Sequence, residues 1–239
     1  MKSILLISVI VFCFHICKGQ EIIEGIGPFK INKTTTSIID ELVKNDGYKV
    51  KVIRKAADNL ILTTRINKII REVYYDTTGF YKDQDQFPAL YFDNIKSYYI
   101  YKYTIAEFEL WSIRLIFKND VLIYYSSSVP AELGDAMALK FGEPERKTDE
   151  KEVTCLYKLT GNQVKSKDKT ITSVWKNGTI SATLTYDDFY DSGCNKHQGY
   201  DLVICDQVFM QQLRDKESEN IRLLKERRGK DNLKNLKDL

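Results

Sequence analysis

The sequence predicts an α+β fold made of two helix-plus-antiparallel-sheet units in tandem, followed by a charged C-terminal helix. Two short segments carry apolar residues at helical spacing, and each of them ends at a glycine. Each is followed by stretches rich in aromatic and β-branched residues, which is a composition typical of strands. Each set of strands contains a turn signal, Lys118-Asn119-Asp120 in the first and Asn177-Gly178 in the second. The repeated order of helix, glycine, strands and hairpin is the basis of the prediction.

The first 19 residues have the pattern of a secretory signal peptide. Lys2 precedes an apolar run from Ile4 to Ile16, and Cys17-Lys18-Gly19 offers small residues where a signal peptidase cuts, so we expect cleavage before Gln20. A lipidated Cys17 is the alternative, which the bulky Ile16 disfavours. The run is shorter than the roughly 20 residues that a membrane span needs, and no later run approaches that length. The chain is therefore expected to be exported, either periplasmic or secreted.

The first unit is expected to cover residues 20–128. Thr34 to Thr36 are candidate helix caps, the helix ends at Asp46-Gly47, and the alternating apolar residues that follow predict a strand. A further strand is predicted over 66–75, with a turn over 76–79 and an exposed loop over 82–86. Residues 97–128 are dense in aromatic and β-branched side chains, which predicts two or three antiparallel strands.

The second unit is expected to cover residues 129–200. Pro130 opens a helix that ends at Gly142, as prolines in a first turn and glycines past the last turn commonly do. Strands are predicted at about 151–159, 170–176 and 179–187, and the polar connection 161–169 is expected to be mobile. Residues 201–239 are expected to form a C-terminal helix or tail. Of the 34 residues from 206 onward, 16 are charged. A solvated helix docked by its first turns is the leading interpretation, and a partner-binding or coiled-coil arm is the alternative.

The helix stop Phe141-Gly142-Glu143-Pro144, followed by antiparallel strands and given twice, resembles the tandem units of the β-lactamase-inhibitor-protein-like group. This group includes the BamE/SmpA-type envelope lipoproteins. The resemblance covers 130–187 well and 31–126 loosely, and it implies an extracytoplasmic protein-binding scaffold without a catalytic centre. The sequence lacks a lipobox, and its first unit is long, which departs from that pattern. Its Lys-, Ile-, Asn- and Tyr-rich composition is similar to that of exported Bacteroidota proteins, and Asp76-Thr77-Thr78 is similar to their short O-glycosylation motif.

The charge and the cysteines narrow the class of protein further. The formal charge of +3 falls to +1 when Lys2 and Lys18 leave with the signal peptide, so no nucleic-acid partner is expected. Three cysteines remain, and an exported chain meets oxidising conditions. We expect a disulfide between Cys194 and Cys205, which would close a short loop, although the other two pairings with Cys155 stay open.

Few residues suggest catalysis. After cleavage His197 is the single histidine, which argues against nucleophile–histidine chemistry, and no nucleotide-binding or metalloprotease motif is present. No metal and no cofactor are expected, since Cys194 and His197 offer one ligand pair where structural zinc sites use two. Acids crowd the end of the last hairpin, at Asp187, Asp188 and Asp191, and could act as a glycosidase pair. They are more often solvated strand ends.

Tyrosines provide the best binding candidates. Tyr99, Tyr101 and Tyr103 alternate, so a regular strand would place all three on one face. An exposed tyrosine stripe could bind a protein or stack on sugars, while a buried one would be part of a core. We therefore expect an exported, non-catalytic binding or scaffold protein of the cell envelope with a protein partner. The alternatives are a carboxylate-dependent glycan hydrolase and a small-ligand carrier.

Overall fold

The computed structural model describes residues 20–53, 68–73, 91–156, 161, 163–191 and 193–237. Nine strands form one mixed sheet in the order β3-β4-β5-β6-β7-β11-β10-β9-β8. These are β3 (Lys49–Ile53), β4 (Ile69–Val73), β5 (Ile95–Ile105), β6 (Phe108–Lys118), β7 (Val121–Ser128), β8 (Glu145–Leu156), β9 (Gln163–Asn177), β10 (Ile180–Tyr190) and β11 (Lys196–Asp206). The pairing of β3 with β4 is parallel, and every other neighbouring pair is antiparallel.

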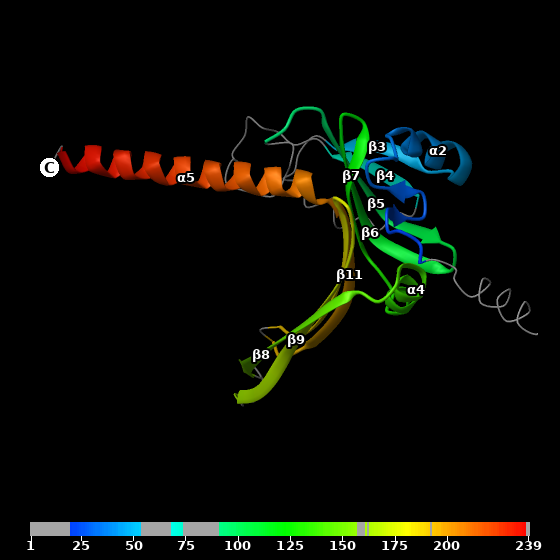
Figure 1. Ribbon diagram of the computed structural model, residues 1–239. Coiled ribbons are helices and arrows are strands. Elements are labelled where there is room, and N and C mark those ends of the chain that lie inside the picture. Colours follow the sequence, from blue (N-terminus) through cyan, green and yellow to red (C-terminus); the bar gives the residue numbers. More distant parts are fainter. Residues whose placement is uncertain are drawn as a thin grey trace, which may run out of the picture.

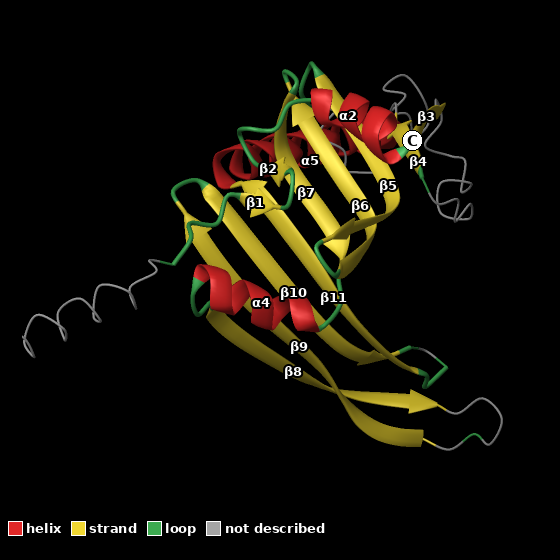
Figure 2. Cartoon of the chain, turned by 90° about the vertical axis from the view of Figure 1, so that its right-hand side faces the viewer, coloured by secondary structure: helices red, strands yellow, loops and turns green. Residues whose placement is uncertain are grey.

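Three helices and a small hairpin pack on this sheet in the described part of the chain. A two-stranded sheet joins β1 (Gly25–Ile26) to β2 (Phe29–Lys30). The helices are α2 (Ser37–Asp46), α4 (Glu132–Phe141) and α5 (Gln207–Lys237). The hairpin, α2 and α4 lie on one face of the sheet, and α5 starts on the opposite face and then projects away from it (Figures 1 and 2).

The predicted α+β fold of two tandem helix-plus-sheet units is wrong. Most of the described chain is strand, and the strands of both expected units belong to the same sheet. β7 and β11 join the two sets, pairing from Ser128↔Asp201 to Tyr124↔Cys205. This pairing removes two exposed strand edges, which would otherwise be open to association with other chains. The expected boundary between 200 and 201 falls inside β11, so it does not separate structural units.

Several local predictions are confirmed. α2 ends at Gly47, which has the left-handed φ of 71° that favours glycine, and α4 ends before Gly142. The β6–β7 turn places Asn119 and Asp120 at positive φ, and β9 and β10 are joined at Asn177-Gly178. The strand β4 lies within the predicted 66–75. The charged C-terminal helix is also present, docked through Phe209 and Leu213.

Other predictions differ from the structure or fall outside it. The connection 161–169, expected to be mobile, forms the first part of β9 from Gln163 onward and pairs with β8. Its polar sequence hid the strand because neither face of this part of the sheet needs apolar residues. The predicted signal peptide 1–19, the turn at 76–79 and the loop at 82–86 lie outside the described residues.

The main hydrophobic core lies under α2, α4 and the β1–β2 hairpin. It runs from Ile70 and Ile100 across Leu115 and Tyr125 to Leu184, with Leu42 and Met137 contributed by the helices. A smaller cluster lies on the other face, where the first turns of α5 meet the sheet. It contains Ile116, Ile123, Phe209 and Leu213. Among the described residues, the sheet is therefore covered on both faces only near the start of α5.

Beyond α4 the strands β8 to β11 extend as an arm, which we define as residues 149–156, 163–170 and 187–199 (Figure 2). Among its described residues only Cys155 and Cys194 are buried. These two cysteines form the disulfide, with their Cα atoms 5.4 Å apart. The preferred pairing of Cys194 with Cys205 is thus wrong. Cys205 lies on β11, is buried and is free.

Candidate functional site

A groove lies where α4 meets the start of the arm. Its volume is about 440 Å³. The lining residues come from α4 and the residue before it and from the facing surfaces of four strands: Ala131, Glu132, Gly134, Asp135, Arg146, Ile171, Ser173, Trp175, Leu184, Tyr186 and Tyr200. Four neighbouring strands thus build one wall and one helix builds the other.

Strand alternation explains why these side chains meet. Tyr186 is the register partner of both Ile171 and Tyr200, so the three side chains form a row across β9, β10 and β11. Arg146 on β8 is in register with Ser173 in the same way. α4 closely approaches the neighbouring row at Gly134, where a Cβ atom would stand 2.9 Å from a Leu184 methyl carbon.

Aromatic rings form the floor of the groove. The centroids of Tyr186 and Tyr200 are 4.7 Å apart. Trp175 is buried on the same face, four residues along β9 from Ile171, and its indole N–H donates a 2.7 Å hydrogen bond to the carbonyl of Gly142, just past the end of α4. The Tyr200 hydroxyl has no hydrogen-bond partner among the described residues, although the ring is held in place. The floor therefore offers fixed aromatic surface and one free hydroxyl.

A carboxylate supports the tyrosine pair from the arm. Asp188 Oδ2 accepts hydrogen bonds from Lys196 at 3.0 Å, Gln198 at 3.2 Å and Tyr186 at 3.3 Å. Burial alone would raise the pKa of Asp188, but these hydrogen bonds outweigh it and lower the pKa. Burial also raises the pKa of Tyr186, and the neighbouring Asp188 carboxylate adds to that effect. Asp188 thus stays ionised and fixes the tyrosine hydroxyl as a donor.

Opposite charges face each other across the rim. Arg146 stands on the sheet side, and Glu132 and Asp135 stand in the first turn of α4. The Arg146 guanidinium is 3.8 Å from Glu143, whose side chain is 85% exposed, so this ion pair is weak. The guanidinium therefore remains available for a ligand at the mouth of the groove.

The three predicted acids do not converge. Asp187 and Asp188 are consecutive on β10 and so point to opposite faces of the sheet. Asp187 accepts a 2.6 Å hydrogen bond from Thr170 on the face away from the groove. Asp191 lies in the turn at the tip of the arm. A pair of acids facing one sugar-sized cleft is not formed by these residues.

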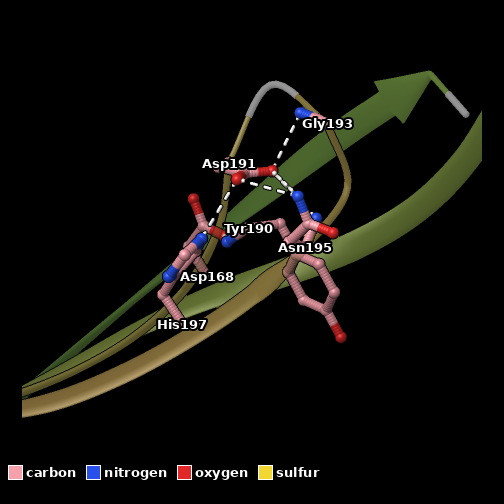
Figure 3. Close-up of polar contacts among 6 residues, drawn as sticks. All are labelled: Asp168, Tyr190, Asp191, Gly193, Asn195 and His197. Carbon is pink, nitrogen blue, oxygen red and sulfur yellow. Dashed lines mark hydrogen bonds and ion pairs between the residues drawn. The ribbon is translucent and has the colours of Figure 1, made fainter. Parts of the chain in front are cut away.

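Asp191 organises the tip of the arm (Figure 3). Its carboxylate accepts hydrogen bonds from the backbone N–H groups of Gly193 and Asn195, both at 2.8 Å, and from the Asn195 side chain. His197 Nε2 lies 3.0 Å from the same carboxylate. Asn195, His197 and Gly193 together hold the pKa of Asp191 well below its usual range. This network shapes the turn that presents Cys194 to Cys155, which is a structural role.

The predicted tyrosine stripe is interrupted in the structure. Tyr103 packs into the main core, 5.5 Å from the Phe29 ring, whereas Tyr99 lies under the Arg71 guanidinium and donates a hydrogen bond to Ser112. Ile100 and Tyr103 both contact the main core, although residues i and i+3 of a regular strand point to opposite faces. The alternation therefore breaks between them, opposite Ser112, whose φ is positive. Tyr101 is half-buried, and binding by these three tyrosines stays a prediction.

The sequence-based interpretation missed the groove. The signal for its floor was present, because the period-2 pattern of 171–186 places Ile171, Ser173 and Trp175 on one face of β9 and Leu184 and Tyr186 on the same face of β10. The position of α4 over that face depends on tertiary packing, which no local sequence pattern indicates. Within the described part of the chain, no group of three His, Cys, Asp or Glu side chains could hold a metal ion.

Comparison of the chain with protein-family models, curated protein sequences and solved structures gave no match. The resemblance to the β-lactamase-inhibitor-protein-like group stays a prediction. In the part of the chain that the structure describes, no helix is long and apolar enough to cross a membrane.

Proposed function

We propose that the protein is an exported, non-catalytic binding protein of the cell envelope, which holds a segment of a partner protein in the groove beside α4. The observation that carries this proposal is the convergence of Tyr186, Tyr200 and Arg146 in one open groove. The few residues that dominate the binding energy at protein interfaces are enriched in tyrosine, tryptophan and arginine. Here the Tyr186 ring is held by its contact with Tyr200 and its hydrogen bond to Asp188 before any partner arrives, which lowers the entropic cost of binding.

The charges at the rim suit a polypeptide better than an apolar small molecule. Arg146 can pair with an acidic side chain of the partner, while Glu132 and Asp135 can pair with a basic one. The free hydroxyl of Tyr200 can accept a hydrogen bond from a backbone N–H group of the partner or donate one to a backbone carbonyl. Bound side chains would stack on the Tyr186–Tyr200 pair in between.

The acids do not support the alternative of a carboxylate-dependent hydrolase. A glycosidase needs two facing acids, and its general acid has a raised pKa. Asp187 and Asp188 point to opposite faces, and the pKa values of Asp188 and Asp191 are lowered. All three also serve as acceptors in hydrogen bonds that hold the arm together.

The disulfide supports the proposal of export. Cys155 and Cys194 are paired, and such bonds persist in oxidising compartments. A signal peptide cleaved near Gly19 would take the chain to the periplasm or outside the cell.

Photo-cross-linking tests the groove. The purified protein carries p-benzoylphenylalanine at position 200, or at position 139 as a control, and is illuminated in an envelope extract of its source organism. Leu139 is on the same helix that walls the groove but is 89% exposed and does not line it. We expect a discrete protein adduct from position 200 and none from position 139.

Affinity measurements with the captured partner complete the test. We expect Tyr200→Ala to weaken binding by about 10- to 100-fold, because a central interface tyrosine contributes about 2 kcal/mol or more. Leu139→Ala should bind like the wild type, and thermal unfolding checks that both variants fold. Equal affinity of Tyr200→Ala and wild type would contradict the proposal, as would an envelope glycan that binds in place of a protein.

A further inference from the structure

A second concave site lies on the other flank of α4. A pocket of about 310 Å³ opens between α4, the β1–β2 hairpin and the turn that joins β5 to β6. The hairpin and α4 lie on the same face of the sheet, as Figure 2 shows. The lining residues are Gly25, Ile26, Gly27, Lys30, Ile105, Ala106, Phe108, Leu133, Ala136, Met137, Lys140 and Phe141. None of them lines the groove, so the two sites are separate.

The wall of this pocket is apolar and stays partly open to solvent. Ile26, Ile105, Phe108 and Phe141 pack against the main core, yet each is only partly buried. Leu133 and Met137 form the base from α4. Exposed apolar area of this kind costs about 25 cal/mol per Å², so an apolar ligand that covers it gains free energy.

Glycine keeps the pocket from being filled by the chain itself. Gly27 has a φ of 50°, and a Cβ atom there would stand 2.7 Å from the Ile105 side chain. The hairpin therefore borders the pocket with backbone where other residues would place side chains.

The two charged residues at the pocket are both lysines. Lys140 is 3.1 Å from Glu21, and both side chains are at least half exposed. The Lys30 ammonium makes no hydrogen bond or close ion pair with any described residue, but its charge adds to the larger effect of Lys33 in lowering the pKa of Glu24. Its neighbour Glu24 is paired with Lys33 at 2.6 Å. Among the described residues no carboxylate lines the pocket, so its mouth favours an anionic group.

We propose that this pocket binds a single-chain amphiphile with an anionic head group, either a carboxylate or a phosphate. The chain lies against Ile26, Phe108 and Met137, and the head group meets Lys30 and Lys140. The volume is at the small end of the range for ligand pockets, about 300–1,000 Å³, so it suits one medium-length chain better than a two-chain lipid. This site is independent of the partner protein in the groove.

Calorimetric titration of the purified protein with decanoate, decyl phosphate and decanol tests the proposal. Decanoate and decyl phosphate distinguish the two sources of negative charge, and decanol has the same chain without a charge. We expect at least one anion to bind about tenfold or more tightly than decanol. Failure of both anions to bind, or equal binding of decanol, would overturn the proposal.

Two variants locate the site. Ala136→Phe fills the pocket and should weaken anion binding at least tenfold, whereas Leu139→Phe, which also introduces a phenylalanine but on the exposed side of α4, should not. Lys30→Gln removes a half-buried charge that makes no close ion pair with any described residue, and it should weaken the anions about tenfold while leaving decanol unchanged. Unchanged anion binding by Lys30→Gln would overturn the proposal even if Ala136→Phe did not fold.

The Tyr200→Ala variant separates this proposal from the groove. It should bind the anion like the wild type, because Tyr200 lines only the groove. Parallel loss of anion binding in Tyr200→Ala would contradict a separate pocket.

Discussion

The body of the sheet and its arm are made of the same strands but are stabilised in different ways. In the body, α2 and α4 cover a continuous hydrophobic core that contains fully buried residues such as Leu115 and Tyr125. In the arm, the described side chains are exposed or half-exposed apart from the two cysteines of the disulfide. One sheet can therefore extend past its core when a covalent bond and ladder hydrogen bonds replace burial.

The groove lies at the boundary between these two regions. Trp175 and Leu184 belong to the core, while Arg146 and Tyr200 lead into the arm. A partner in the groove would contact a rigid floor on one side and side chains supported by the arm on the other. The body would thus contribute the buried floor of the binding site, and the arm would contribute the side chains at its other side.

The largest expected effect comes from the body. Trp175→Ala removes a side chain that is 5% exposed, together with its hydrogen bond to Gly142. Loss of packing of this size costs about 3–5 kcal/mol in the free energy of unfolding. Chemical denaturation measures the change, and Trp175→Phe should cost clearly less because a large ring remains. A loss below about 1 kcal/mol for Trp175→Ala would show that the core does not extend to the groove.

The second-largest expected effect is loss of the disulfide, which should destabilise the arm and leave the body unchanged. Replacing Cys155 and Cys194 together by serine opens a loop of sequence separation 39, and such bonds contribute about 2–4 kcal/mol. We expect hydrogen exchange to speed up at the arm amides, within 149–156 and 187–199, while the amides of β6 and β7 keep their protection. Cys205→Ser is the control for thiol loss without loss of the disulfide. Equal acceleration in body and arm would contradict the separation.

Whether a feature could be predicted from the sequence depends on how far apart in the sequence the residues that form it lie. The Asn-Gly hairpin, the glycine at the end of α2 and the charged C-terminal helix depend on residues close in sequence, and all three are confirmed. The pairing of β7 with β11 joins residues more than 70 positions apart, so no local pattern predicted the single sheet.

The candidate site residues show the same difference between local and long-range features. The disulfide partner of Cys194 was predicted by loop length, but the arm brings Cys155 close because β8 and the β10–β11 turn end at the same tip. The tyrosine stripe assumed regular alternation, which the interruption near Ser112 breaks. The residue types alone indicated that a disulfide and buried tyrosines were present. Which cysteines pair, and which face of the sheet each tyrosine occupies, depended on bulges and on long-range strand register.

The smallest expected effect is at the tip of the arm. The pKa of Asp191 is lowered in the folded chain from an ordinary value of 3.8, so its ionised form stabilises the tip above that pH. This stabilisation should decrease as the pH falls below about 4 and disappear at the folded-state pKa. NMR signals of the Gly193 and Asn195 amides follow the change. Asp191→Asn should lose this dependence, and a wild-type transition above pH 4 would contradict the assignment.

Hydrogen exchange of the protein alone and with its cross-linked partner bound tests the central claim most directly. If the groove is the binding site, protection should increase in 132–135 of α4, in 171–175 of β9 and in 184–186 of β10, which line it. The amides of β3 and β4, at the far edge of the sheet, should be unchanged. Protection confined to α5 or to the face of the sheet opposite α4, with none in the groove segments, would contradict the account.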